Sequence, residues 1–362
     1  MFQENRVLLN INDYLLQKYP DASIEKEEFV YLTSPKEEYD SLRNGVGLRI
    51  NPDLKIIQLS GKDILDFLNR VSTNALMNIK MFDKINTLFL NEKGRFIDRT
   101  TFIPLEDRSL LVGSPDRDNR LLSWLNKYII MEDIKAEDYS EKYAMVDIIG
   151  PQTESFLTLI LGKDIIISDE KRVRRFDVDG FTFYSFLTRE GNSIKFFRFL
   201  IEREKLLNFI DYLIGIKSVF DLSVIGRQAF DFFRIENLIP AFPNEINDLT
   251  NPYEVNLINE VSFTKGCYIG QEVIARLDTF SKVKRKLVAV NLIHEIINSE
   301  PFTIIDDNSN QVGEITTLSK MNSANGKIAL ALINIKAIND ESKLYANVEG
   351  QQIPLTIIEA QK

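Results

Sequence analysis

The segment KGCYIGQEVIAR, at positions 265–276, combines the side chains best suited to chemistry. It holds Cys267, the only cysteine of the 362 residues, with Lys265 two positions before it. Glycines stand on both sides, and the pattern after Gly270 predicts a short amphipathic helix. A cation and a helix N-terminus near a thiol favour the thiolate, which is the nucleophilic and metal-binding form. The alternative is a buried structural cysteine that behaves as a small hydrophobic residue.

Histidine and cysteine are too scarce for several common kinds of site. His294 is the only histidine, so a Ser-His-Asp triad would have to include it, and a histidine-rich zinc site is excluded. Its surroundings predict an ordinary strand or surface residue. One cysteine cannot form an internal disulfide, which fits a reducing cytoplasm. A lone thiolate cannot hold an iron–sulfur cluster that needs four ligands, so no resident metal is predicted.

The overall charge and hydrophobicity argue against two classes of partner, although a local basic groove is compatible with them. The formal net charge is −9, and like charges repel nucleic acid and anionic membranes at long range. The basic run at 282–286 is interpreted as a solvated boundary segment rather than a nucleic-acid patch. No apolar run reaches the ~20 residues that span a bilayer, and the first ten residues do not resemble a signal peptide. We therefore expect no direct nucleic-acid partner and no membrane association.

Local patterns predict a mixed α+β chain that ends in an all-β module. Ser60 and Asp63 have the spacing of a capping box before a helix, and Pro151 is placed as the first residue of another helix that Gly162 ends. The other expected elements are strands at 55–59, 87–90, 95–103, 176–178, 181–187 and 196–201, and helices at 118–130 and 204–214. The order strand–helix–strand–strand–helix occurs twice, as in ferredoxin-like units. From Arg285 onward, short strands separated by turns predict a small barrel.

These patterns divide the chain into four parts. Residues 1–140 form a first α+β unit, 141–219 a second one, 220–284 a segment that returns to the first unit, and 285–362 the barrel. A chain of this length is expected to hold two or three domains of ~100–200 residues.

The eight residues from Lys265 to Glu272 resemble the signature of the YgfZ-type folate-binding proteins, relatives of the glycine-cleavage T-protein (aminomethyltransferase) that take part in iron–sulfur protein maturation. The similarity extends from about Gly45 onward and is weakest at 164–218. The segments that carry it are 58–63, 72–74, 90–98, 233–240, 243–245, 251–254, 312–316 and 328–331. The resemblance implies an aminomethyltransferase-like α+β fold, with two ferredoxin-like units around a central folate cavity and a C-terminal barrel.

The resemblance also suggests roles for individual residues. Asp98 occupies the place of the T-protein's catalytic aspartate, whose carboxylate would accept the N–H donors of a buried pterin. Arg99 follows it where the enzyme has a second acid, and Arg95 replaces a glycine. The alternative is a strand-end carboxylate paired with one of these arginines. With Cys267 and Lys265, Asp98 is a candidate for chemistry.

Five further residues are candidates for folate binding. Arg234, near the end of a predicted helix, suits the glutamyl carboxylates of a folate tail, although an ordinary surface pair is equally expected there. Glu190 stands roughly where the T-protein has a longer run whose glutamate holds the pterin. Tyr268, Gln271 and Glu272 complete the signature; the alternatives are a core tyrosine and two residues that satisfy a helix start.

The leading functional hypothesis is a protein that binds tetrahydrofolate or a derivative and assists iron–sulfur enzymes or their assembly proteins through the Cys267 loop. Support of tRNA thiolation would then be indirect. The alternative is an aminomethyltransferase that transfers a one-carbon unit to tetrahydrofolate with a lipoyl-carrier partner. A third hypothesis, an RNA-associated protein, is disfavoured by the acidic charge.

Overall fold

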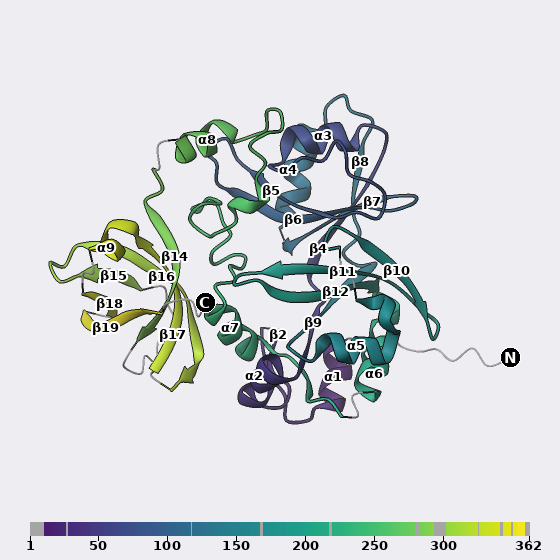
Figure 1. Cartoon of the computed structure of the whole chain (residues 1–362), viewed down its shortest axis with the longest axis horizontal. Coiled ribbons are helices and arrows are strands. Elements are labelled where there is room, and N and C mark those ends of the chain that lie inside the picture. The colour runs from purple at the N-terminus through teal and green to yellow at the C-terminus, as the bar shows by residue number, and fades with distance from the viewer. Residues whose placement is uncertain are drawn as a thin grey trace.

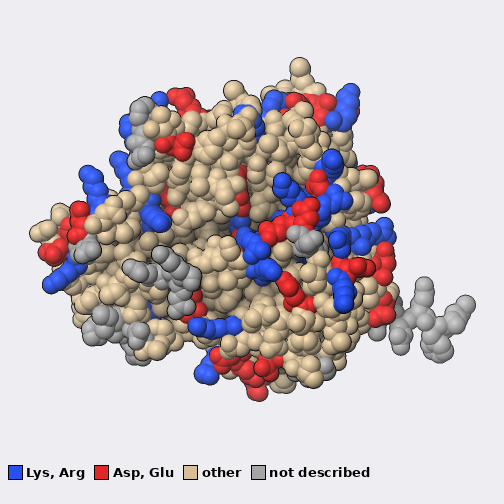
Figure 2. Space-filling model, in the orientation of Figure 1, with Lys and Arg blue, Asp and Glu red and all other residues tan. Residues whose placement is uncertain are grey.

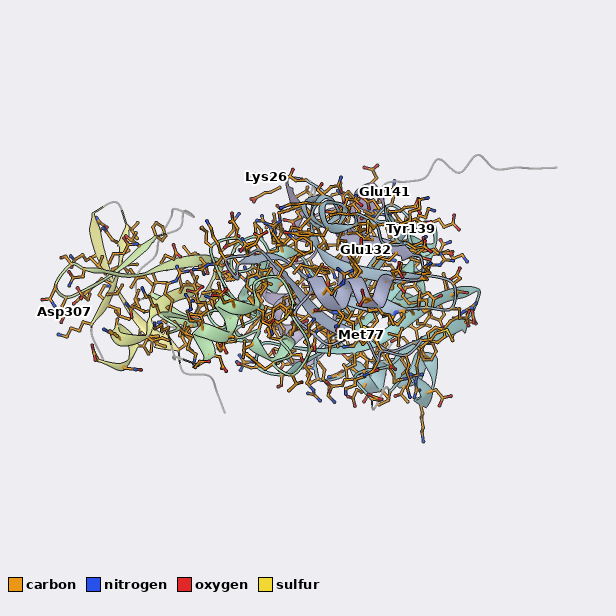
Figure 3. The ribbon with its side chains drawn as sticks, turned by 90° about the horizontal axis from the view of Figure 1, so that it is seen from above. Lys26, Met77, Glu132, Tyr139, Glu141 and Asp307 are labelled. Carbon is orange, nitrogen blue, oxygen red and sulfur yellow. The ribbon has the colours of Figure 1, made fainter. Side chains whose placement is uncertain are left out.

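The computed structural model describes residues 11–26, 28–116, 118–166, 169–216, 219–279, 282–292, 302–324, 326–340, 343–348 and 350–358. Within these ranges the chain forms two large sheets covered by helices, and a closed barrel (Figure 1). Seen from above, the barrel lies at one end of the molecule, where Asp307 is labelled (Figure 3). The predicted combination of α+β units with a terminal barrel is confirmed. His294 lies outside the described residues.

The first unit is a five-stranded antiparallel sheet with two helices on one face. Its elements are β4 (Leu54–Ser60), α3 (Ile64–Val71), β5 (Ile85–Leu90), β6 (Phe96–Pro104), β7 (Ser109–Pro115), α4 (Arg120–Tyr128) and β8 (Lys135–Asp138). The strand order is β5-β6-β7-β4-β8. Phe67 of α3 and Leu121 of α4 pack with Ile57 and Phe89 of the sheet. This apolar core holds both helices on the sheet.

The second unit is a six-stranded sheet in the order β10-β11-β12-β9-β3-β13. Its elements are β3 (Val46–Asn51), β9 (Tyr143–Ile149), α5 (Thr153–Leu161), η1 (Lys163–Ile165), β10 (Val173–Val178), β11 (Phe181–Glu190), β12 (Ile194–Glu202), η2 (Arg203–Lys205), α6 (Leu206–Gly215) and β13 (Leu222–Val224). Phe156 of α5 and Phe209 of α6 belong to the core on one face. Strand β3 comes from within 1–140 and β13 from within 220–284, so the sheet draws strands from three of the expected segments.

The N-terminal segment packs on the second unit. It consists of α1 (Ile11–Lys18), β1 (Ser23–Glu25), β2 (Glu28–Tyr31) and α2 (Pro35–Asn44). Leu15 and Leu32 belong to the same core as the helices α5 and α6. The two large sheets face each other through a further core, in which Ile56 and Ile103 of the first meet Phe186 of the second. The result is a layered arrangement of helices, sheet, sheet and helices.

The barrel closes through six strands in the order β14-β17-β16-β15-β18-β19. Its elements are β14 (Arg285–Leu292), β15 (Thr303–Asp306), β16 (Gln311–Ser323), β17 (Gly326–Asn334), α9 (Ile335–Asn339), β18 (Leu344–Val348) and β19 (Gln351–Ile358). Between the second sheet and the barrel run α7 (Arg227–Glu236), η3 (Ile258–Glu260) and α8 (Gln271–Thr279). Helix α7 lies near the centre of the molecule, between the barrel and the N-terminal segment that packs on the second unit (Figure 1).

Two local predictions about helix starts are wrong. Ser60 is the last residue of β4, and Asp63 is the N-cap of α3. Asp63 makes no cap bond, because its carboxylate accepts the Asp133 N–H at 2.8 Å instead. Helix α5 begins at Thr153, two residues beyond Pro151. Both sequence patterns correctly predicted a nearby helix, but they placed its first residue wrongly. Tertiary contacts decide where a helix begins.

The surface of the described chain is mixed in charge. On the face shown in Figure 2, basic and acidic side chains are interspersed rather than gathered by sign. Among the described residues, no helix is long and apolar enough to cross a membrane. Within the same ranges, no cluster of three or more His, Cys, Asp or Glu side chains is arranged to hold a metal ion.

Candidate functional site

Asp98 is buried on the face of the first sheet that α4 covers. Its carboxylate accepts the N–H of Arg99 at 2.8 Å and that of Ser114 at 3.2 Å. A Cβ atom at position 113 would collide with this carboxylate, so Gly113 makes room for it. Burial raises the pKa of Asp98 to about 6, against the weaker opposing effects of the Ser114 side chain, of these two backbone hydrogen bonds and of Arg120. Asp98 can therefore hold or release a proton near neutral pH.

Arg99 points to the opposite face of the same strand, toward the second sheet, because successive strand residues alternate. Its guanidinium donates to Glu190 of β11 at 2.6 Å and grips both oxygens of Glu260. Arg198 of β12 donates to the other oxygen of Glu190 at 2.8 Å. Burial disfavours the charge of Glu190, but the two arginines hold its pKa below the usual value. Both oxygens of this predicted pterin ligand are thus taken by arginines.

Arg234 is almost fully buried near the end of α7 and joins that helix to the barrel. It donates to Asp231 at 2.8 Å, to Glu245 at 3.0 Å and to the Thr317 hydroxyl of β16 at 2.8 Å. Burial opposes its charge, but the carboxylates of Glu245 and Asp231 raise the pKa of Arg234. Most N–H donors of Arg234, which was predicted to bind a folate tail, are therefore used in hydrogen bonds within the protein.

Lys265 anchors the signature loop to the end of α3. Its ammonium donates to the carbonyls of Asn69 at 2.6 Å, Asn74 at 2.9 Å and Ser72. Ser72 is the residue that ends α3, where a cation is favoured by the helix dipole. Burial lowers the pKa of Lys265 to about 8, while the three carbonyl oxygens favour the charged form. All three N–H donors of the ammonium are directed at backbone rather than at the thiol.

Cys267 is exposed on this loop, so the alternative of a buried structural cysteine is excluded. Tyr268 is buried against the first unit, in a core shared with Phe96, and burial raises its pKa to about 12. Gln271 begins α8, and Glu272 is exposed and pairs with Arg276 one turn later. The structure therefore places Tyr268 in the core and Glu272 on the surface.

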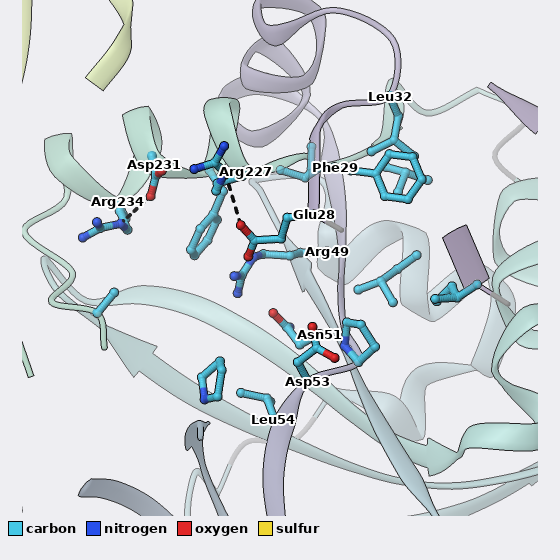
Figure 4. Close-up of a pocket in the computed structure, with 18 of the residues that line it drawn as sticks. Glu28, Phe29, Leu32, Arg49, Asn51, Asp53, Leu54, Arg227, Asp231 and Arg234 are labelled. Carbon is cyan, nitrogen blue, oxygen red and sulfur yellow. Dashed lines mark hydrogen bonds and ion pairs between the residues drawn. The ribbon is translucent and has the colours of Figure 1, made fainter. Parts of the chain in front are cut away.

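A cavity of about 370 Å³ lies beside α7, between β2, the turn from β3 to β4, and the loop before Asn244 (Figure 4). Apolar side chains line one part of it. They include Ile11, Leu15, Phe29, Leu32, Val224, Ile225 and Phe230. Polar and charged groups line the rest, and they include Glu28, Arg49, Asn51, Asp53, Arg227, Asp231, Arg234 and Asn244. Such a cavity suits a largely flat, apolar ligand with polar or anionic groups at its edge.

The structure brings only some of the predicted residues together. Asp98 and the signature loop belong to the first unit: the Gly270 backbone packs closely on the turn at 91–94 that precedes β6. Of the predicted site residues only Arg234 lines the cavity beside α7, while Glu190 lines a smaller hollow of about 160 Å³ with Arg99 and Glu260. The cavity and the Cys267 loop are separate features of the surface.

Several residues of this architecture were not identified from the sequence. Arg49 and Asp231 line the cavity, Glu260 completes the pairing of Arg99, and Glu245 that of Arg234. Arg49 stands in an ordinary amphipathic strand pattern, and no motif distinguishes it. Glu245 belongs to the segment 243–245 that carries part of the family resemblance, but the resemblance suggested no function for it.

Comparison with known proteins places this geometry in context. The model of the GCVT N-terminal domain matches residues 17–265. An aminomethyltransferase of Staphylococcus epidermidis is 24% identical over 358 residues, covering 95% of this chain and 96% of the relative. One of Thermotoga neapolitana is 23% identical over 342 residues, covering 91% and 89%. The crystal structure of the glycine cleavage system aminomethyltransferase T of Bartonella henselae superposes with a TM-score of 0.77 at 16% identity, covering 96% of this chain and 95% of that one. The predicted aminomethyltransferase-like fold is confirmed.

Proposed function

Because the chain belongs to the family of the GCVT N-terminal domain, we propose that it binds tetrahydrofolate or a derivative in the cavity beside α7. The chemistry of the cavity wall supports this, since one part is apolar and the other offers hydrogen-bonding groups. Asp231 uses one carboxylate oxygen for Arg234, and among the described residues the other accepts no hydrogen bond. That oxygen and the side-chain amide oxygens of Asn51 and Asn244 would accept hydrogen bonds from the N–H groups of a pterin.

Calorimetric titration with tetrahydrofolate tests this proposal. Asp231→Asn removes a charged acceptor from the cavity wall, so its affinity should fall about tenfold. Asp98→Asn tests the position implied by the resemblance, where the carboxylate lies under α4 and outside the cavity lining. If wild type takes up no tetrahydrofolate, the proposal is wrong. If only Asp98→Asn weakens binding, the folate lies elsewhere in the first unit.

We also propose that the protein assists iron–sulfur enzymes or their assembly proteins in the cytoplasm, and so supports tRNA thiolation indirectly. One observation carries this part: Cys267 is exposed on an anchored loop and does not line the cavity. A ligand held beside α7 does not reach it, so the thiol is available to a partner protein. Such a partner would have to supply the other ligands or redox groups, because a single thiolate holds no cluster.

The accessory role is tested in cells by the activity of iron–sulfur enzymes. Cells that carry Cys267→Ala should lose much of that activity, while Thr264→Ala, an exposed change in the same loop, should retain it. Normal activity of the iron–sulfur enzymes in cells that carry Cys267→Ala would contradict the proposal. Equal protein levels, checked by immunoblot, separate loss of the thiol from loss of the fold.

A second candidate function is aminomethyl transfer to tetrahydrofolate. It is favoured by the nearly full-length similarity to proteins named aminomethyltransferase. Against it stands Glu190, whose two oxygens are engaged by Arg99 and Arg198. Formation of methylenetetrahydrofolate from an aminomethylated lipoyl carrier would establish this activity, and its absence under conditions where tetrahydrofolate binds would exclude it.

A further inference from the structure

Arg49 presents a guanidinium to the cavity from β3, the neighbour of the edge strand β13 in the second sheet. The Phe230 ring of α7 lies below it, with 3.8 Å between the guanidinium carbon and the ring centroid. The guanidinium is planar by delocalisation, and the stacking covers one of its faces while its N–H groups point outward along its edges. In Figure 4, Arg49 lies between Glu28 and the turn that carries Asn51 and Asp53.

The donors of Arg49 are not used within the described part of the chain. Arg49 makes no hydrogen bond there, and its ion pair is with Asp147, 4.0 Å away. Asp147 already accepts a hydrogen bond from Asn51 at 2.9 Å, and Arg198 lies 3.6 Å from its other oxygen. Burial lowers the pKa of Arg49 against the weaker opposing effect of Asp147. The Arg49 side chain is still 33% exposed, so its N–H groups are accessible from the cavity, and an acceptor that enters can bind them without breaking a bond within the described part of the protein.

The two other arginines of the cavity differ from Arg49. Arg234 is bonded to Asp231 and Glu245, and Arg227 pairs with Glu25 at 2.9 Å. Figure 4 marks the contact of Arg227 with Glu28 as well. An anionic ligand would have to displace a carboxylate from either of them. Arg49 requires no such displacement.

We propose that Arg49, stacked on Phe230, receives a carboxylate of the cavity's ligand through its free N–H edges. A planar guanidinium matches a carboxylate with two parallel hydrogen bonds, a fit that neither a neutral carbonyl nor a lysine reproduces. The inference rests on the proposed folate binding. It assigns the glutamyl end of the folate to Arg49 and makes the cavity selective for ligands that combine a flat ring system with a carboxylate.

A thermodynamic cycle tests the inference by calorimetry. The ligands are tetrahydrofolate and its diamide, which has the same rings and no carboxylate; the proteins are wild type and Arg49→Met. Wild type should bind tetrahydrofolate about tenfold or more tighter than the diamide, and Arg49→Met should bind both equally. Arg49→Lys should retain only part of the preference, since it keeps the charge and loses the paired donors. Arg276→Met, an exposed change on α8, should behave as wild type.

Each other outcome has a definite meaning. If wild type binds tetrahydrofolate and Arg49→Met keeps the full preference for the carboxylates, Arg49 serves only Asp147 and the inference is wrong. Equal binding of both ligands by wild type would also overturn it. If wild type binds neither ligand, the proposed folate function itself fails, and this inference with it. Arg49→Lys keeps the test decisive if circular dichroism shows that Arg49→Met does not fold.

Discussion

At the scale of single residues, Asp98 has surroundings that favour its neutral form. The carboxyl group is buried beneath α4, and this burial outweighs the hydrogen bonds that it accepts from the backbone of Arg99 and from the backbone and side chain of Ser114. Its pKa is about 6 in the folded chain, against 3.8 for an ordinary aspartate. Because the folded state binds the proton more tightly than the unfolded state, Asp98 contributes stability at low pH and loses that contribution as pH rises through 6.

This shift predicts a pH-dependent effect of Asp98→Asn. Asparagine stays neutral, so the variant avoids the cost of ionising a buried acid. Relative to wild type, its free energy of unfolding should increase by roughly 2 kcal/mol between pH 4 and pH 7. Urea denaturation at several pH values measures this difference. Asp53→Asn, at an exposed position, should show no such trend, and a pH-independent effect of Asp98→Asn would contradict the burial argument.

The sequence identified charged residues that the fold buries, but it did not identify their partners. Arg234 and Glu190 have the chemistry expected of folate ligands, yet the fold uses both in buried ion pairs. The partner of Glu190 is Arg99, 91 residues away in the chain, and no local pattern predicts such a pair. Arg49 was overlooked for the same reason, since Phe230 comes from a distant helix.

At the scale of elements, the signature loop is held by the end of another helix. The Lys265 ammonium binds three carbonyls around the C-terminus of α3, and the chain then passes Cys267 on its way to α8. The pattern of the sequence correctly predicted a helix after Gly270. It suggested that Lys265 would act on the thiol, whereas the structure directs all of its donors to backbone. Lys265 is therefore interpreted as a positioning residue.

Lys265→Met should loosen the loop without changing how the thiol responds to pH. Loss of the charge-assisted bonds should lower the free energy of unfolding by roughly 2–3 kcal/mol. Hydrogen exchange at 262–270 should accelerate. The rate of Cys267 alkylation should keep the pH dependence of wild type, because the ammonium does not face the thiol. Mass spectrometry measures both quantities.

The matched control for this change is Lys62→Met, near the other end of the same helix. Lys62 is largely exposed and lies 3.9 Å from Asp133, a kind of pair that contributes little. It should leave both the exchange at 262–270 and the alkylation profile unchanged. A shift of the alkylation profile toward higher pH in Lys265→Met would instead show that the ammonium acts on the thiol.

At the scale of the whole molecule, the barrel and most of the helices were predicted from the sequence, because alternation, helical periodicity and turn residues are local signals. Strands β3, β7 and β9 were not among the expected elements. Which strands belong to which sheet was harder to predict. Strands β3 and β13 join the second sheet from distant parts of the chain, and a short strand leaves no sign of which sheet it completes. Long-range packing therefore limited the prediction of the cavity more than that of the fold.

A buried polar junction ties the barrel to the rest of the molecule. Glu245 is fully buried and accepts hydrogen bonds from Arg234 at 3.0 Å, from the Ala241 N–H at 3.0 Å, and from the hydroxyls of Thr316 and Thr317 at 2.6 Å each. Both threonines belong to β16 of the barrel, and Arg234 belongs to α7. The same carboxylate thus holds the barrel strand and the helix that lines the cavity.

Glu245→Ala should be strongly destabilising, because it leaves the Arg234 charge buried with Asp231 as its only carboxylate. We expect the free energy of unfolding to fall by about 3–5 kcal/mol, and Arg234→Met in addition to Glu245→Ala to cost less than the sum of the single changes. Chemical denaturation of the two single variants and the double variant measures this coupling. Glu314→Ala removes a partly exposed carboxylate from the same strand, paired with Arg285, and should cost less than about 1 kcal/mol. Additive effects of the two changes would mean that the junction is not a coupled unit. The position of the barrel would then depend on its other contacts, such as the apolar core that it shares with α7 and residues 246–268.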